Sequence, residues 1–322
     1  MFRPTRGMGS RPKYSLQEDE TMYIDTETLI TAIYLVIDNW YLNEGHKYLK
    51  GRPGRKPDFT HSEMITIMIL KEFLQFSSER KFLGFMHGNH LEIFPDLVDQ
   101  SQFNRRSRTL YLIMEKVRSH CAEELGVQLA SLYILDTEPV PVVGYKRSKK
   151  NSDFFGDAEY GYCASKKLHY WGYKFVMLTT GDGLPVAFEL VPANTDERDA
   201  AEEVLHAANP GSIALGDKGF IDKERQEDWK KRYDVTTYTY KRKNQHKQNS
   251  PAVQQLLSEN RRQIETTFSS LDRVEGLQDH GAKTVSGLVT RTIAKVTAYT
   301  FRKYLLRFHG INVLTLQIVN IS

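Results

Sequence analysis

The sequence predicts an α/β fold in which an all-α region precedes a mixed sheet. Residues 25–127 show helical periodicity, whereas from residue 128 short β-branched and aromatic runs alternate with helical segments. Three acidic residues, Asp136, Asp217 and Glu265, stand where strands or a helix would hold them rigidly. We therefore expect four parts in this order: a flexible basic arm (1–24), a helical domain (25–127), an α/β domain (128–310) and a C-terminal tail (311–322).

Composition excludes several classes of protein. The chain of 322 residues has 44 basic and 40 acidic residues and a net charge of +4, so clusters of charge are more informative than the total. Its two cysteines, Cys121 and Cys163, are too few for a disulfide scaffold and suit a reducing cytoplasm. The longest apolar run, Leu29 to Ile37, is far too short for a membrane span, so we expect a cytoplasmic protein without a membrane partner.

The amino-terminal third is predicted to be helical. One apolar face begins at Leu29 and ends at Trp40, and a second helix begins at Thr60, where Glu63 completes a capping box. Asp99 introduces a long third helix with its own apolar face, and the start of this helix carries Arg105, Arg106 and Arg108.

These arginines allow two interpretations of the helical region. The first is a helix-turn-helix-like DNA-binding module whose arginine-bearing helix contacts phosphates or base edges. The second is a plain helical bundle with a solvated charged face, which is the more common origin of such a pattern.

The α/β part is predicted element by element. A strand over residues 131–136 ends at Asp136, and a long polar segment (144–168) follows it. A hairpin of residues 173–180 and 184–191 turns at Gly181-Asp182-Gly183, and a helix begins at Asp196. A strand that leads to Asp217 follows, and after it come a helix and a strand at 235–240. The order ends with a helix from Ser250-Pro251 and a final helix over 286–306. That order is the order of a ribonuclease-H-like mixed sheet, in which acids at adjacent strand ends and on a later helix meet.

Three converging carboxylates indicate a divalent cation site. Hard oxygen ligands suit Mg²⁺, and a pair of such ions suits phosphoryl transfer by in-line displacement, as in a nuclease or transposase. Each acid also has a simpler explanation. Asp217 fits a turn, Glu265 fits a helical ion pair with Arg261, and Glu138 is a rival ligand because it shares a sheet face with Asp136.

The polar segment after the first strand is rich in lysine and tyrosine. Its lysines and arginine are candidates for holding phosphates without reading sequence. The tyrosines Tyr145, Tyr160 and Tyr162 are candidates for stacking on unpaired bases, and the alternative is a mobile surface loop. The basic candidates in this segment are Lys146, Arg147, Lys149, Lys150, Lys166 and Lys167.

At these residues the sequence resembles insertion-sequence transposases of bacteria and archaea from the DDE superfamily, most closely the insertion-sequence family designated 982. The likeness extends from about Thr28 to Leu306. It rests on these blocks: Leu135-Asp136-Thr137 with Pro139, Gly172-Tyr173-Lys174, Pro192-Ala193-Asn194 with Asp196, Gly216-Asp217-Lys218-Gly219-Phe220, and Arg261-Arg262-Gln263-Ile264-Glu265 with Phe268. Many relatives carry a tyrosine before the motif arginine and a lysine after the glutamate, where this chain has Ser258 and Asp272.

The resemblance implies that Asp136, Asp217 and Glu265 bind two Mg²⁺ ions per active site, for which Mn²⁺ substitutes. It also implies double-stranded DNA as the partner, both as element ends and as target, and a homodimer or higher assembly because an element has two ends. Lys218, Arg261 and Arg262 are further candidates for phosphate contacts. Two rival functions are a non-transposing metal-dependent nuclease and a catalytically silent DNA-binding protein derived from a transposase.

Overall fold

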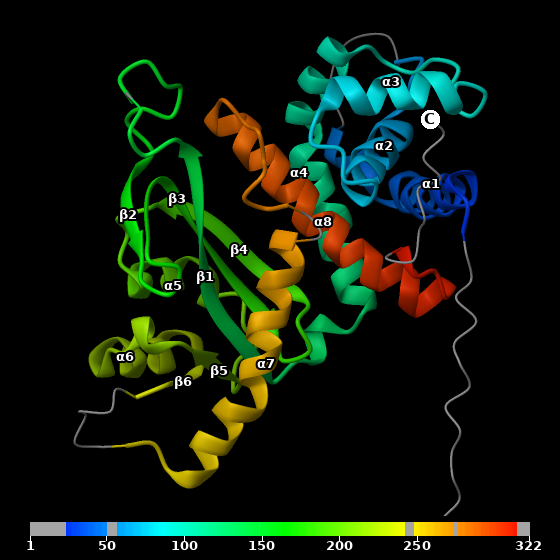
Figure 1. Cartoon of the computed structure of the whole chain (residues 1–322). Coiled ribbons are helices and arrows are strands. Elements are labelled where there is room, and N and C mark those ends of the chain that lie inside the picture. The colour runs from blue at the N-terminus through cyan, green and yellow to red at the C-terminus, as the bar shows by residue number, and fades with distance from the viewer. Residues whose placement is uncertain (1–23, 50–56, 148, 242–247, 274–275, 314–322) are drawn as a thin grey trace, which may run out of the picture.

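A computed structural model describes residues 24–49, 57–147, 149–241, 248–273 and 276–313 of the chain. Within the helix Pro251–Arg273, the side chains of residues 261–266, 268, 272 and 273 lie outside the described ones. The fold combines helices and one mixed sheet (Figure 1). No described helix combines the length and the apolar character that crossing a membrane requires.

Four helices form the described part of the amino-terminal region, and a side chain caps the start of each. The Thr60 hydroxyl accepts the Glu63 backbone N–H at 3.2 Å, and Glu63 accepts the Thr60 N–H at 2.6 Å, which confirms the capping box. Asp25, Ser78 and Asp99 cap the other three helices in the same position. The helices are α1 (Thr26–Asn43), α2 (His61–Phe73), α3 (Glu79–Asn89) and α4 (Gln100–Glu124).

The sheet has the strand order expected of a ribonuclease-H-like fold. Strand β3 pairs antiparallel with β1 on one edge and with β2 and β4 on the other, while β5 and β6 extend the sheet from β1 in parallel. The order β4-β3-β1-β5-β6 confirms the predicted α/β fold. The strands are β1 (Leu132–Val143), β2 (Glu159–Cys163), β3 (Leu168–Thr180), β4 (Pro185–Pro192), β5 (Ile213–Gly216) and β6 (Thr236–Thr239).

Two strand predictions were wrong. Strand β1 does not end at Asp136 but continues to Val143, and β2 lies inside the segment predicted to be a polar loop. The continuation contains Pro139 and Pro141, and β5 pairs with β1 only as far as Leu135. Beyond that residue no described strand pairs with this edge of β1, and a proline, which lacks an N–H, is tolerated at such an edge.

Helices cover both faces of the sheet (Figure 1). On one face α5 (Glu197–Leu205) and α6 (Lys223–Tyr233) pack Val204 and Trp229 against Tyr133 and Leu135. On the other face α7 (Pro251–Arg273) and α8 (Val285–His309) pack Leu271 and Val296 against strand residues that include Phe175 and Met177. Because alternate residues of a strand point to opposite faces, both sides of the central strands are apolar, as in a buried sheet.

Helix α8 joins the sheet to the amino-terminal helices. The sequence predicts that its apolar residues pack on the sheet, and Leu288 and Val296 do so. Ile293 and Phe301 instead lie in the core formed by α1, α2 and α4. The prediction was therefore half wrong, because a helix that is apolar on two sides buries both of them. The proposed boundary between residues 127 and 128 stays a prediction.

A buried ion cluster fixes α8 against α2. Glu72 accepts from Lys71 at 2.8 Å and from Lys295 of α8 at 3.0 Å, and all three side chains are buried. Burial alone would raise the pKa of Glu72, but the charges of Lys295 and Lys71 outweigh burial and lower it. Glu72 is therefore held as an anion between two cations in the interior.

We expect Glu72→Gln to lower the free energy of unfolding by about 3 kcal/mol, because it leaves two buried ammonium groups without this carboxylate. Chemical denaturation at neutral pH measures the change. Glu123→Gln, at an exposed position of α4, is the control and should change stability by less than about 0.5 kcal/mol. Equal stability of the two variants would show that the cluster does not hold α8 in place.

Candidate active site

The pairing of β1 with β5 brings Asp136 and Asp217 together. Leu135 pairs with Gly216 in parallel register, and Asp136 and Asp217 are the next residue of each chain segment. Strand β5 ends at Gly216, so Asp217 lies just beyond a strand end, as the sequence predicts, while Asp136 lies within β1. Two of the three predicted acids are thus neighbours in the folded protein.

The described charged groups that act on Asp136 are negative. The pKa of Asp136 is raised to about 7, mainly by burial and in addition by the negative charges of Asp217, Glu138 and Glu197, while a hydrogen bond from the Thr137 N–H acts in the opposite direction. That N–H donates to Asp136 at 2.8 Å. Such a carboxyl ionises readily only when a positive charge comes to lie beside it.

Glu197 is an acid of this site that the sequence reasoning missed. It is the first residue of α5, and its carboxylate lies against Gly219, where an added Cβ would be 1.2 Å from Oε2. Burial raises the pKa of Glu197, Lys174 lowers it, and Asp217 and Asp196 raise it again, so that the net shift is upward. The sequence does show two adjacent acids, Asp196 and Glu197, a few residues after a strand. The sequence analysis interprets them only as the start of a helix.

Glu138 lies on the same face of the sheet as Asp136 and is buried. Its carboxylate accepts hydrogen bonds from Lys166 and from Gln278, which lies between α7 and α8. The rival ligand suggested by the sequence is thus held by a cation and an amide at the border of the acidic site.

The third predicted acid, Glu265, belongs to α7. This helix contacts β1. Near the carboxyl-terminal end of the helix, Leu271 packs in the same core cluster as Val140 and Phe175, on the sheet face that carries Asp136. The side chains of Glu265, Arg261 and Arg262 lie outside the described residues. Among the side chains that are described, no group of three or more His, Cys, Asp or Glu residues is arranged to hold a metal ion.

A pocket of about 350 Å³ opens beside Glu197. It is lined by Lys174, Asp196, Glu197, Arg198, Lys218, Gly219 and Ile221. Lys174 donates to the Thr195 carbonyl at 2.5 Å, whereas Lys218 is exposed. The predicted phosphate contact Lys218 therefore stands at the rim of a pocket that shares a wall with the acidic site.

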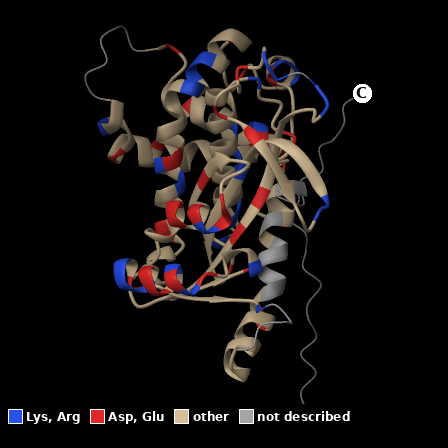
Figure 2. Cartoon of the chain, turned by 90° about the vertical axis from the view of Figure 1, so that its left-hand side faces the viewer, with Lys and Arg blue, Asp and Glu red and all other residues tan. Residues whose placement is uncertain are grey.

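The predicted basic residues fall into two groups. Arg105, Arg108, Lys146, Arg147, Lys150 and Lys167 are exposed, and Figure 2 shows Lys and Arg on the loop after β1 and at the β2–β3 turn. Three others are engaged within the protein. Arg106 donates to the Thr60 carbonyl at 3.1 Å, Lys149 is buried and donates to the carbonyls of the β1–β2 loop, and Lys166 pairs with Glu138.

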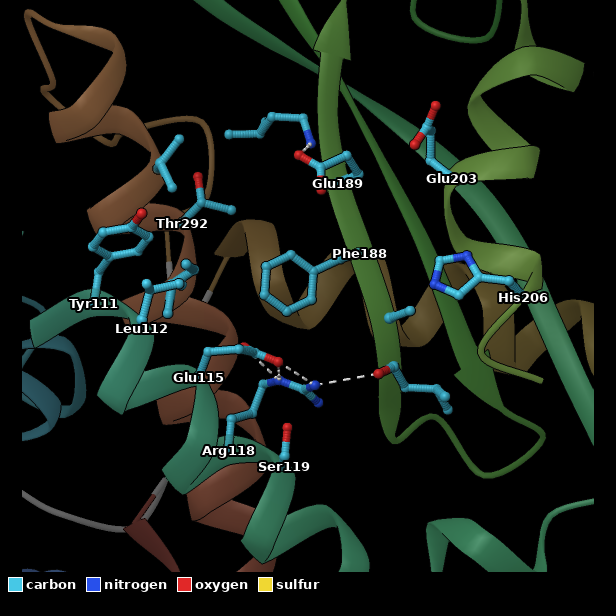
Figure 3. Close-up of a pocket in the computed structure, with 15 residues that line it drawn as sticks. Tyr111, Leu112, Glu115, Arg118, Ser119, Phe188, Glu189, Glu203, His206 and Thr292 are labelled. Atoms are coloured by element: carbon cyan, nitrogen blue, oxygen red, sulfur yellow. Dashed lines mark hydrogen bonds and ion pairs between the residues drawn. The ribbon is translucent and has the colours of Figure 1, made fainter. Parts of the chain in front are cut away.

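A larger pocket of about 460 Å³ lies between α4, β4 and α8 (Figure 3). Phe188 and Glu189 of β4 face it, and Arg118 at its floor bonds Glu115 and the Pro185 carbonyl. None of Asp136, Asp217 and Glu197 lines this pocket. Its size alone therefore does not make it the chemical site, and the acidic site remains the candidate.

Comparison with known families decides what the acidic site belongs to. The family described as "Transposase DDE domain" matches residues 128–301, more than half of the chain. The chain belongs to this family of transposases. The match covers the whole sheet, both adjacent aspartates, Glu197 and the part of α7 that carries Glu265. The neighbouring carboxylates of Asp136 and Asp217 therefore lie within the part of the chain that belongs to this transposase family.

The solved structures that resemble this chain are distant from it in sequence and in structure. The Mos1 transposase paired-end complex with left transposon end is 10% identical over 76% of this chain and 87% of that one, with a TM-score of 0.19. The pre-cleavage Mos1 transpososome is 13% identical over 84% and 86% of the two chains, also with a TM-score of 0.19. No protein with a curated description matches the sequence. The fold therefore rests on the strand order and the family match.

We expect Asp136→Asn to raise the thermal unfolding midpoint at pH 8 and to leave it nearly unchanged at pH 4. The pKa of Asp136 rises from 3.8 to about 7 on folding, so ionisation opposes folding increasingly as the pH rises between these values, and fully above them. The substitution removes this opposition. Differential scanning calorimetry of the protein in EDTA measures it.

The same experiment in Mg²⁺ tests the charge imbalance. Added Mg²⁺ should raise the midpoint of the wild type and of the exposed-site control Asp153→Asn, but have little effect on Asp136→Asn. A wild type that is indifferent to Mg²⁺ at millimolar concentration would contradict a cation site at this place.

We expect Gly219→Ala to displace the Glu197 carboxylate, because the new Cβ takes its position. The variant should lose about 1 kcal/mol of stability, and it should lose clearly less when Glu197 is already alanine, which is the signature of coupled residues. Urea denaturation of the wild type, Gly219→Ala, Glu197→Ala and the double variant measures this coupling. Gly84→Ala, where nothing lies within 4 Å, is the control and should cause no loss.

Proposed function

We propose that this transposase mobilises an insertion sequence of the bacterial and archaeal family designated 982. It binds the terminal inverted repeats, cleaves DNA at the ends and joins the liberated 3′-hydroxyl to target DNA. The observation that carries the proposal is the register of β1 and β5, which sets Asp136 beside Asp217 with a raised pKa in a chain of the DDE family.

The donor set suits magnesium. Carboxylate oxygens are the ligands that Mg²⁺ prefers, and Mn²⁺ takes the same ligands. Asp136 and Asp217 would hold the ions, and Glu265 on α7 would complete the second site. When bound, the ions neutralise charge and activate the attacking oxygen of water or of the 3′-hydroxyl.

The protein's own groups prepare the site for this chemistry. The negative charges of Asp217, Glu138 and Glu197 near Asp136 favour a cation, and the adjacent strands hold Asp136 and Asp217 close together. Glu197 adds negative charge from the opposite face of the sheet, and Glu138 ties Lys166 to the border of the site. Positioning and charge neutralisation together account for most catalysis of phosphoryl transfer.

Double-stranded DNA is the proposed partner, both as element ends and as target. Arg105 and Arg108 at the start of α4 are exposed, as are Lys218 and most of the basic loop, and all are suited to phosphate contacts. Arg261 and Arg262 precede Glu265 on α7 and are proposed to contact backbone near it. Because an element has two ends, we propose a homodimer or higher assembly on nucleoid DNA.

The decisive experiment is cleavage of DNA that carries the ends of the chain's own element, in Mg²⁺ or Mn²⁺. We expect Asp136→Asn, Asp217→Asn and Glu265→Gln to lower the cleavage rate by about 10³-fold or more, while each variant still binds the ends. Asp153→Asn, an exposed carboxylate on the loop after β1, is the matched control.

Other results would favour other functions. Variants that cleave like the wild type would refute this metal site. Cleavage without preference for the element's ends would indicate a non-transposing nuclease. End-specific binding by a wild type that never cleaves would indicate a silent DNA-binding protein descended from a transposase.

A further inference from the structure

Four aromatic side chains gather on the β2–β3 hairpin and the loop before it. Tyr145 meets the Tyr160 ring edge-on at 5.6 Å between centroids and lies 6.1 Å from the His169 ring. Tyr162 and His169 stack more closely, at 4.5 Å and 35° between planes. We call these four residues the aromatic platform.

The platform is exposed although its residues are large. Tyr145, Tyr160 and Tyr162 retain 48%, 53% and 56% of their accessible surface. Other large aromatic residues of the same strands, Trp171 and Tyr173, are almost fully buried. Because exposed aromatic surface is unfavourable in water, three exposed tyrosines linked by ring contacts through His169 indicate a surface that binds a ligand.

Lys149 holds the platform in place from below. It is buried, and its ammonium donates to the carbonyls of Gly144, Tyr145 and Arg147. The same ammonium lies 5.8 Å from the Tyr160 ring and 5.6 Å from the Trp171 ring. The loop that carries Tyr145 is thereby tied to the hairpin, so the rings are positioned in advance of any ligand.

The platform shares a sheet face with the acidic site. Asp136 pairs with Met177 of β3, and alternate residues of β3 from Met177 down to His169 point to that same face. His169 pairs with Tyr162, and Trp171 pairs with Tyr160, so both tyrosines face the same way. The turn of the hairpin also bends back to the acids, because Lys166 in this turn bonds Glu138, two residues after Asp136.

Positive charge surrounds the platform. Lys146, Arg147 and Lys150 are exposed on the loop that carries Tyr145, and Lys167 is exposed at the hairpin turn. Figure 2 shows Lys and Arg at both places. Cations beside exposed rings match a nucleic acid strand, which offers phosphates and base faces together.

We propose that the aromatic platform stacks on unpaired bases of the DNA strand next to the cleavage position. The base faces of an intact duplex are covered by their neighbours, so flat exposed rings gain contact only where bases are unstacked. This inference rests on the proposed function for its location, and it adds that the transposase binds DNA that is locally unpaired beside the acids.

Binding to two simple probes tests the proposal. The probes are a fluorescein-labelled single strand of twelve thymidines and a 24-base-pair duplex of arbitrary sequence, with fluorescence anisotropy of the full chain in EDTA as the readout. We expect Tyr160→Ala and Tyr162→Ala to weaken binding to the single strand about tenfold each, and binding to the duplex less than twofold. Tyr160→Phe and Tyr162→Phe keep the ring and should bind the single strand like the wild type.

Three results would overturn the proposal: alanine variants that keep full affinity for the single strand, phenylalanine variants that lose as much as alanine variants, or an equal loss for the duplex. Tyr48→Ala, an exposed tyrosine of the amino-terminal region, controls for a general loss of aromatic surface. Wild-type melting temperatures for all variants establish that each one folds.

Photocrosslinking gives a test that needs no variant. A thymidine strand with one 5-iodouracil, irradiated with the wild type, should crosslink to peptides that contain Tyr145, Tyr160 or Tyr162. Crosslinks confined to other peptides would refute the platform. If the platform is refuted while Asp136→Asn and Asp217→Asn still abolish cleavage, the proposed function stands alone. Crosslinks to the platform in a protein that never cleaves would refute the function instead.

Discussion

The burial of the Asp136 carboxyl beside other acidic residues is the constraint around which the rest of the structure is arranged. Parallel pairing of β1 with β5 forces two carboxylates side by side, and Glu197 and Glu138 add negative charge nearby. The protein tolerates this arrangement because both faces of the sheet are covered by apolar helices, whose burial supplies the stability that the acids remove. A buried carboxyl with other acidic groups beside it lowers stability, as the residues of active sites often do.

The helices that cover the sheet also link the acidic site to the rest of the chain. Helix α7 carries Glu265 across the face that holds Asp136, and α8 follows it into the core of the amino-terminal helices. Glu72 and Lys295 lock α8 against α2 in the interior. The amino-terminal helices therefore have a rigid connection to the sheet through α8.

Basic residues near the site serve two different purposes. Lys149 and Lys166 are engaged by carbonyls and by Glu138, and they shape the loop and hairpin beside the acids. Lys146, Arg147, Lys150 and Lys167 remain exposed around the aromatic rings. Within one lysine-rich segment, some cations are thus engaged by carbonyls or by a carboxylate of the protein itself, and others remain on the surface.

The sequence alone determined the order of the helices and strands apart from β2, the capping box at Thr60 and the position of Asp217 just after a buried strand. These features depend on neighbouring residues, whose periodicity and capping chemistry can be read locally. The length of β1 was misjudged because the tolerance for Pro139 and Pro141 depends on the absence of a partner strand on one edge.

Only the tertiary structure decided which distant groups meet. Glu197 reaches the acids because α5 begins beside Gly219, and the small size of that glycine leaves room for the carboxylate. Arg106 and Lys149 look like phosphate ligands in the sequence, yet each bonds backbone carbonyls of its own fold. The physical reason is that a charged side chain binds whichever partner packing brings within reach, and packing is set by the whole chain rather than by its neighbours in sequence.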